Sequence, residues 1–179
     1  MIENLSANRV LWAVTALLAL VASAIGVANP AIYDHVVSAE IRPGVLSQDI
    51  VTIIASLLVL GLVARVRADS ATGPLVILGV MGFYFYAYGI YTIERLYNPL
   101  YLVYMALFGL SLYAIVCGLA SLSTTALQRV ALPGRVRYAT IAFLLLVTVV
   151  FNNLWISALL PLMRTGEKIE FYYSVYILD

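Results

Sequence analysis

Tyrosines recur at helical spacing in the most apolar part of the chain, where their hydroxyls could hold a polar ligand. Tyr84, Tyr88 and Tyr91 share one face of a predicted helix, and Tyr101 and Tyr104 share a face of the next. At about 1.5 Å per residue, Tyr84 lies roughly 12–15 Å below the predicted membrane surface. A phenol at that depth needs a hydrogen-bond partner. Aromatic packing inside a bundle is the alternative explanation.

Two asparagines supply a second polar signal at a similar depth. Asn152 and Asn153 lie within the last long apolar stretch. Polar side chains inside a membrane turn toward other helices, so we expect one of the two to face the tyrosines. The sequence predicts a ligand pocket, open to the outside, lined by Tyr84, Tyr88, Tyr104 and Asn152 or Asn153. Hydrogen bonding between helices without any ligand is the simpler alternative.

Three charged residues are predicted to rim the entrance of this pocket. Glu94 and Arg95 occupy the short turn between the two tyrosine-bearing stretches, and Asp49 lies at the predicted outer end of another helix. As a solvated pair, Glu94 and Arg95 contribute little to stability. Apart from tyrosines and Cys117, no ionisable group lies deep in a predicted span. That absence weighs against a proton-coupled carrier or an ion pump.

Composition and motifs exclude several functional classes. The net charge of +1 gives no basic field for nucleic acid, and the one cysteine cannot form an internal disulfide or a CxxC pair. A single histidine cannot supply two axial haem ligands. Asp34, His35 and Glu40 form only a weak metal-binding pattern, so neither a metal nor a cofactor is predicted. Hydrolase, zinc-protease and phosphate-loop motifs are absent from the sequence, which favours a protein that is not an enzyme.

Five apolar stretches must position these residues. The chain is 64% apolar and 11% charged, whereas a soluble domain carries about 25% charge. Stretches long enough to approach or reach a membrane span are Val10–Ala28, Ile50–Ala64, Pro74–Ile93, Pro99–Leu122 and Tyr138–Leu160. Backbone groups in hydrocarbon need internal partners, so these stretches are helices. The sequence therefore predicts an all-α membrane helical bundle of five transmembrane helices, in a single domain over residues 1–179.

Local signals place the helix starts. Asn98 before Pro99 is typical of a helix N-terminus, so we expect the third and fourth helices to be antiparallel neighbours. Arg42-Pro43-Gly44 is interpreted as a breaker within the loop of residues 29–48. Ser47 or Asp49 would then cap the second helix.

Both ends of the chain allow a second interpretation. Ala22-Ser23-Ala24 matches a signal-peptide cleavage pattern, although the apolar run is long and only Arg9 precedes it. Ile169–Leu178 is too short to span a membrane. It could lie in the interface, form a short strand or begin a sixth helix truncated at Asp179.

Basic residues favour a cytoplasmic N-terminus in a cell-membrane protein, because excess arginine and lysine mark the cytoplasmic side. With this orientation the inner side carries six basic and two acidic residues: Arg9, Arg65, Arg67, Arg129, Arg135, Arg137, Glu3 and Asp69. The outer side carries four basic and seven acidic residues: Arg42, Arg95, Arg164, Lys168, Asp34, Glu40, Asp49, Glu94, Glu167, Glu170 and Asp179.

The segment from Tyr97 to Leu112, YNPLYLVYMALFGLSL, resembles a motif of uncharacterised prokaryotic multi-pass integral membrane proteins. Glu94 and Arg95 before it, and the tyrosine-rich end at 171–179, fit the same resemblance. In such proteins a further hydrophobic segment follows, which would make the present chain truncated. The resemblance implies no activity.

Three functional hypotheses follow. The first is a non-catalytic accessory protein, or one that binds a small apolar or lipid-like ligand from the outer side. The second is a small oligomeric transporter. The third is a membrane enzyme acting on lipids or quinones at the outer rim, through Asp49, Glu94 or His35. Expected partners are membrane lipids and a second copy or a larger membrane complex. Small-residue pairs such as Ala19/Ser23, Ala22/Gly26 and Ala114/Gly118 would serve self-association or internal packing.

Overall fold

The computed structural model describes residues 2–67, 69–70, 72–123 and 133–166, and these are mainly helical. The elements are α1 (Leu5–Ala28), the 3-10 helix η1 (Pro30–Tyr33), α2 (Arg42–Arg65), α3 (Thr72–Ile93), α4 (Tyr101–Ala120) and α6 (Gly134–Thr165). Five helices are long and apolar enough to cross a membrane, which confirms the predicted fold class. Residues 169–178, the predicted sixth segment, lie outside the described residues.

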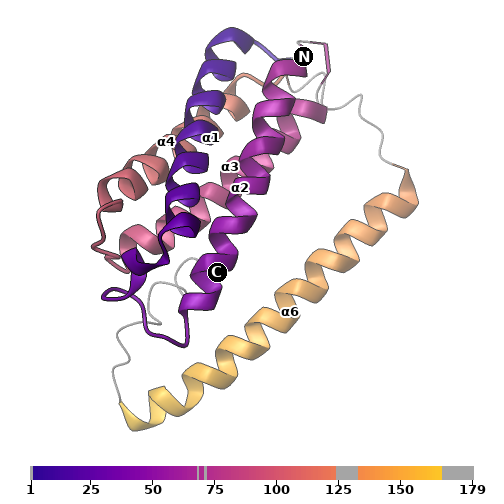
Figure 1. The fold of residues 1–179 in the computed structure, drawn as a ribbon. Coiled ribbons are helices and arrows are strands. Elements are labelled where there is room, and N and C mark those ends of the chain that lie inside the picture. Colours follow the sequence, from indigo (N-terminus) through magenta and orange to yellow (C-terminus); the bar gives the residue numbers. More distant parts are fainter. Residues whose placement is uncertain (1, 68, 71, 124–132, 167–179) are drawn as a thin grey trace. The chain divides into compact units, whose positions relative to one another are not determined.

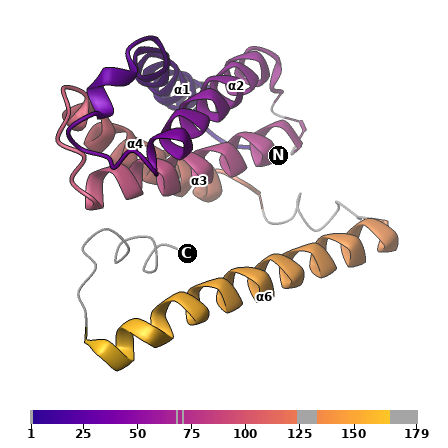
Figure 2. The ribbon, with the colours of Figure 1, turned by 60° about the horizontal axis from the view of Figure 1, so that its bottom comes forward.

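Contacts divide the chain into two units, residues 1–127 and 128–179, and each is described by itself. The single domain over residues 1–179 stays a prediction. The first unit is a bundle in which α1 packs on α2 and α4, and α3 packs on α2 and α4 (Figure 1). Seen from a second direction, the α1–α2 pair lies above the α3–α4 pair (Figure 2). The short connections between α2 and α3 and between α3 and α4 make neighbouring helices antiparallel, as expected for the hairpin.

Helix α2 begins earlier than the sequence predicts. It starts at Arg42, with Pro43 in its first turn, so Arg42-Pro43-Gly44 starts a helix instead of breaking one. Proline is favoured there because its missing N–H would be unsatisfied at a helix start in any case. Ser47 and Asp49 are therefore interior residues of α2 and cap nothing; the Ser47 hydroxyl donates to the Pro43 carbonyl at 2.8 Å.

The turn after α3 is closed by a residue in the left-handed conformation. Arg95 has φ 57°, a conformation that glycine usually supplies at this position. The Arg95 and Leu96 amides donate to the carbonyls of Thr92 and Tyr91, at 3.2 and 3.1 Å, the pattern of a Schellman motif. Leu96, only 3% exposed, anchors this turn in the apolar core. The tip is thus a fixed connection that sets how α3 meets α4.

Helix α4 begins at Tyr101, two residues later than the start predicted at Pro99. Asn98 still organises the start, because its side-chain oxygen accepts from the Leu100 amide at 2.9 Å.

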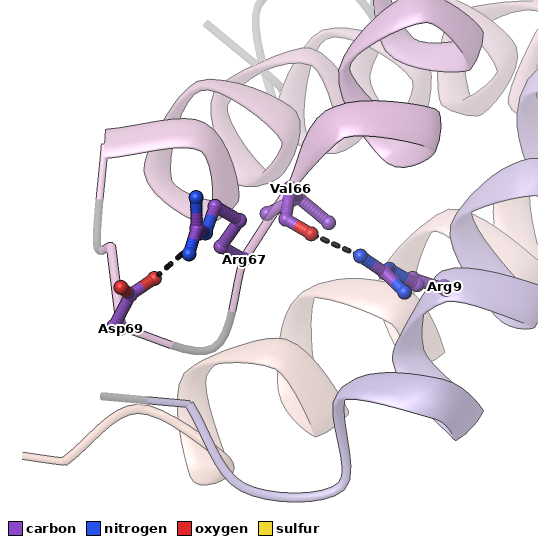
Figure 3. A network of polar contacts seen from close by, with 4 residues as sticks. All are labelled: Arg9, Val66, Arg67 and Asp69. Atoms are coloured by element: carbon purple, nitrogen blue, oxygen red, sulfur yellow. Dashed lines mark hydrogen bonds and ion pairs between the residues drawn. The ribbon is translucent and has the colours of Figure 1, made fainter.

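Polar contacts join the opposite end of the bundle. The Arg9 guanidinium donates to the carbonyl of Val66, directly after α2, while Arg67 and Asp69 lie 3.6 Å apart at the surface (Figure 3). A cation at a helix C-terminus is favourable because the carbonyl ends of the peptide dipoles point there. The Asn8 amide donates to the Ser121 hydroxyl at 2.9 Å. The start of α1 is therefore tied to the ends of both α2 and α4.

The bundle is apolar outside and polar near its axis. Its outer face carries exposed aliphatic side chains such as Val10, Ile54 and Leu102, at 65%, 64% and 76% exposure. Buried polar residues are Asn8, Thr15, Ser23, Asp49, Thr52, Ser56 and Ser111. This distribution suits lipid surroundings, in which polar side chains turn toward protein. Together with the five helices, it describes a multi-pass membrane protein.

The small-residue pairs serve internal packing. Ala19, Ala22, Ser23 and Gly26 are all buried along one side of α1. In α4, Ala114 and Gly118 are buried in the same way. Small side chains at these positions let neighbouring backbones approach closely.

Candidate functional site

Asp49 is a buried carboxylate within a membrane-spanning helix. Its side chain is 2% exposed, and α2 continues on both sides of it. The sequence places Asp49 at an exposed rim; the difference arises because α2 starts at Arg42 and because η1 folds over this part of the helix. An ionisable group inside a spanning segment is a candidate functional site by default. The sequence predicts no deep ionisable group apart from tyrosines and Cys117, and this argument against proton coupling fails because Asp49 is such a group.

The 3-10 helix η1 brings the principal partner of Asp49. The Tyr33 hydroxyl donates to Asp49 Oδ2 at 2.7 Å, and Tyr33 itself is fully buried. Burial, reinforced by the neighbouring Tyr104 hydroxyl, raises the pKa of the Tyr33 phenol far above its ordinary value. Tyr33 thus stays protonated and keeps its donor for the carboxylate. The Ser23 hydroxyl of α1 also lies close to the Asp49 side chain.

Gly26 allows this close arrangement. A Cβ atom there would overlap Asp49 Oδ2 and would lie 2.5 Å from the Tyr33 hydroxyl. Helix α1 therefore presents bare backbone where Asp49 and Tyr33 meet. The site depends on a missing side chain as much as on those present.

Two of the predicted ligand-binding residues, Tyr88 and Tyr104, lie near this carboxylate, and Tyr84 lies one helical turn from Tyr88, next to Ser56. Tyr84, Tyr88 and Tyr104 are all buried, and the ring centroids of Tyr88 and Tyr104 lie 5.8 Å apart in a stacked arrangement. Tyr91 packs edge-on against Tyr104, with the two ring centroids 5.0 Å apart. Their predicted role in ligand binding stays a prediction; here they form the aromatic centre of the bundle.

Hydroxyl groups link this aromatic centre to the carboxylate and to the hairpin tip. Tyr33 and Tyr104 hydroxyl oxygens lie 3.4 Å apart, and the Asn98 amide donates to the Tyr104 hydroxyl at 3.1 Å. On the other side, the hydroxyls of Ser23 and Tyr88 lie 3.2 Å apart. Farther along, Ser56 and Tyr84 share a hydrogen bond of 2.7 Å. Most buried hydroxyls near Asp49 are therefore satisfied within the protein. Tyr91 is the exception, because its hydroxyl has no hydrogen-bond partner among the described residues.

The remaining predicted site residues lie elsewhere. Asn152 and Asn153 belong to α6, in the second unit, where each side-chain amide donates at 2.8 Å to a carbonyl of its own helix. Glu94 and Arg95 lie at the hairpin tip, with Arg95 exposed. Asp34, one of the weak metal-binding candidates, forms an ion pair with Arg42 at 2.7 Å.

Sequence reasoning missed Tyr33 as a site residue. It lies in a segment interpreted as a loop, and no periodicity marks it. Ser23 and Gly26 did carry a signal, because both belong to small-residue pairs on one helix face. Such pairs indicate that another segment approaches α1 closely, but they do not identify Asp49 as the neighbour.

A separate groove runs along the lipid-facing side of α1 and α4. It encloses about 770 Å³ and is lined by Asn4, Ala7, Asn8, Val10, Leu11, Val14, Tyr113, Cys117, Ala120 and Ser121. These residues belong to the start of α1 and the end of α4, so the groove opens at the end opposite to Asn98. Its walls are mainly apolar, with Asn4, Asn8 and Ser121 as polar groups toward one end.

No family model, no curated protein and no solved structure matches this chain. The resemblance of the Tyr97–Leu112 segment to prokaryotic multi-pass membrane proteins therefore stays a prediction, and function must be argued from the site alone.

Proposed function

We propose that this multi-pass membrane protein is non-catalytic and binds a lipid-like ligand in the groove between α1 and α4. The groove itself carries the proposal. Its volume of about 770 Å³ falls in the range of small-molecule sites, which are lined mostly by apolar side chains with a few polar groups. An acyl chain would lie along Val10, Leu11 and Val14. A polar end group would lie near Asn4 and Ser121.

This site differs from the one expected from the sequence. The sequence favours a pocket open to the outside among tyrosines, yet those tyrosines are closely packed against one another. The groove lies instead at the arginine-bearing end, where Arg9 stands one residue from Asn8. An amphiphile with a polar or anionic end group suits that position, because the positive charge of Arg9 attracts it.

Filling the groove should displace the ligand. Val14→Trp places a large ring on the groove wall, and we expect the lipid retained after detergent extraction to fall severalfold, as measured by native mass spectrometry. Val21→Trp is the matched control, because Val21 lies on the same helix with 48% exposure against 49% for Val14, and does not line the groove. Equal lipid retention in both variants and the parent protein would refute the proposal.

We further propose that the protein lies in the cell membrane with its N-terminus inside. In support, Arg9 is tied to Val66, so that Arg65 and Arg67 lie at the same end of the bundle as Arg9. Asp34 and Glu94 belong to the opposite end, where η1 and the hairpin tip meet through Tyr104. The first end thus carries three described arginines against Glu3 and Asp69, and the other end carries Arg42 and Arg95 against Asp34, Glu40 and Glu94. An excess of arginine at one end follows the rule that cytoplasmic ends are basic.

Cysteine labelling tests this orientation. With Cys117 replaced by serine, Glu40→Cys should react with an impermeant maleimide on intact cells. Ser70→Cys should react only after lysis. Both positions are exposed in the structure, so neither result depends on burial. Labelling of Ser70→Cys on intact cells, with Glu40→Cys protected, would reverse the proposed orientation.

A further inference from the structure

We infer that Asp49 is a proton-binding site, reached from the hairpin tip through the hydroxyls of Tyr104 and Tyr33. This inference is independent of the lipid groove, which lies at the other end of the bundle. It rests on the connected hydrogen bonds between Asn98 and Asp49 and on the absence of a cation beside the carboxylate.

The first observation is the set of groups that surround Asp49. Tyr33 donates to it from η1 at 2.7 Å, and Tyr104 of α4 lies 3.4 Å from the Tyr33 hydroxyl. Tyr88 and Tyr91 of α3 pack on Tyr104, with ring centroids 5.8 and 5.0 Å from its own. Helix α1 contributes the Ser23 hydroxyl and the backbone of Gly26, neither of which titrates. The nearest basic residue along α2, Arg42, is paired with Asp34.

All titratable neighbours of Asp49 in the described chain are thus phenols, and none is a cation. A buried charge without a cationic partner has a large desolvation cost, which hydrogen bonds offset only in part. A bound proton removes that charge. The carboxylate is therefore set to exchange a proton, not to hold a permanent ion pair.

The second observation is the direction of the hydrogen bonds. Tyr33 commits its proton to Asp49 at 2.7 Å, so its oxygen can only accept from Tyr104, 3.4 Å away. The Tyr104 oxygen in turn accepts from the Asn98 amide at 3.1 Å. Every donor in this series of hydrogen bonds points toward the carboxylate. Asn98 is partly exposed, so the series of hydrogen bonds begins next to water.

Proton uptake along this series of hydrogen bonds leaves every intermediate group with the number of protons it had before. A hydronium at the tip, once the Asn98 amide moves aside, gives its proton to the Tyr104 oxygen and becomes water. Tyr104 passes its own proton to Tyr33, and Tyr33 passes its own to Asp49 Oδ2. Each phenol receives one proton and releases one, so both end neutral and Asp49 ends protonated.

The route does not continue to the other end of the bundle. On the α1 side of Asp49, the Tyr88 hydroxyl donates to the Ala19 carbonyl at 3.4 Å, so Ser23 gives its only proton to Tyr88, 3.2 Å away. A backbone carbonyl cannot pass a proton on, so the described chain holds a binding site with access from one side. The packing at Gly26, where even a Cβ would overlap Asp49, leaves no room for a metal ion between Oδ2 and α1.

Carbon-13 NMR of the full chain in lipid bilayers tests the site. The sequence has four aspartates, so labelling them gives four side-chain carboxyl signals, and Asp49→Asn identifies one by its loss. We expect that signal to move from the carboxylate to the carboxylic-acid position as pH is lowered, separately from the other three. A signal that keeps one position wherever the fold persists would overturn the inference. So would a response to Na⁺ at constant pH.

The route is tested by the rate of that change. After a jump in pH outside proteoliposomes, protonation of Asp49, followed by its infrared carboxyl band, should slow by about a hundredfold in Tyr104→Phe. Tyr101→Phe is the matched control, because the Tyr101 hydroxyl is at the same end of α4 but donates to the Thr92 carbonyl at 3.0 Å. Equal rates in both variants and the parent protein would overturn the route through Tyr104.

Discussion

Gly26→Ala is expected to destabilise the bundle by about 3 kcal/mol. The added Cβ overlaps the Asp49 carboxylate and lies 2.5 Å from the Tyr33 hydroxyl. Neither group can move freely, because each is buried and hydrogen-bonded to the other. The substitution must push α1 away or break the Tyr33–Asp49 hydrogen bond. Unfolding by added sodium dodecyl sulfate, followed by circular dichroism in mixed micelles, measures the loss.

Gly61→Ala provides the matched control. Gly61 is also a helical glycine, in α2, and a Cβ there meets nothing within 4 Å in the described chain. Alanine is the better helix former, so this variant should be neutral or more stable by about 0.5–1 kcal/mol. Similar stability of the Gly26 and Gly61 variants would show that α1 does not approach Asp49 as closely as the structure has it.

Tyr33→Phe should cost about 2–3 kcal/mol, because it removes a hydrogen bond to a buried carboxylate and leaves the acceptor unsatisfied. The ring keeps its volume, so no large cavity forms and the loss reports on the hydroxyl alone. The same detergent titration measures it. Tyr97→Phe controls for the generic effect of losing a phenol hydroxyl, because Tyr97 is 66% exposed and does not line the groove.

A double-mutant cycle identifies the partner. In an Asp49→Asn background the charge is gone, and the cost of Tyr33→Phe should fall to about 1 kcal/mol, that of a neutral hydrogen bond. Additive losses would mean that Tyr33 stabilises the fold through contacts other than Asp49.

Hydrophobicity and length were sufficient to predict the helices. Each of the five predicted stretches became a helix, because backbone groups in an apolar medium have few alternatives. The hairpin also followed from local signals, since Asn98 does organise the start of α4. The start of α2 did not, because Pro43 is compatible with both a loop and a first helical turn.

The site was less accessible to sequence reasoning, because its contacts join residues far apart in the chain. Asp49 meets Tyr33 from a segment without periodicity, and Tyr33 meets Tyr104 across the bundle. Single-residue properties suggested that Asp49 would stay near water, as charged residues usually do. Tyr84, Tyr88 and Tyr104 were recognisable by spacing, but spacing alone does not distinguish a ligand pocket from a packed centre.

The contact between the start of α1 and the end of α4 has a consequence for biosynthesis. Ile2 pairs with Leu122, and the Glu3 amide donates to the Ser121 carbonyl at 2.8 Å, so residues before the first helix bind residues after the fourth. A ribosome releases α1 long before α4 is made. The Asn8 amide therefore cannot form its hydrogen bond with Ser121 until α4 has been synthesised, and until then it lies in the translocation machinery or among lipid headgroups. The bundle can close only after its fourth helix has been inserted.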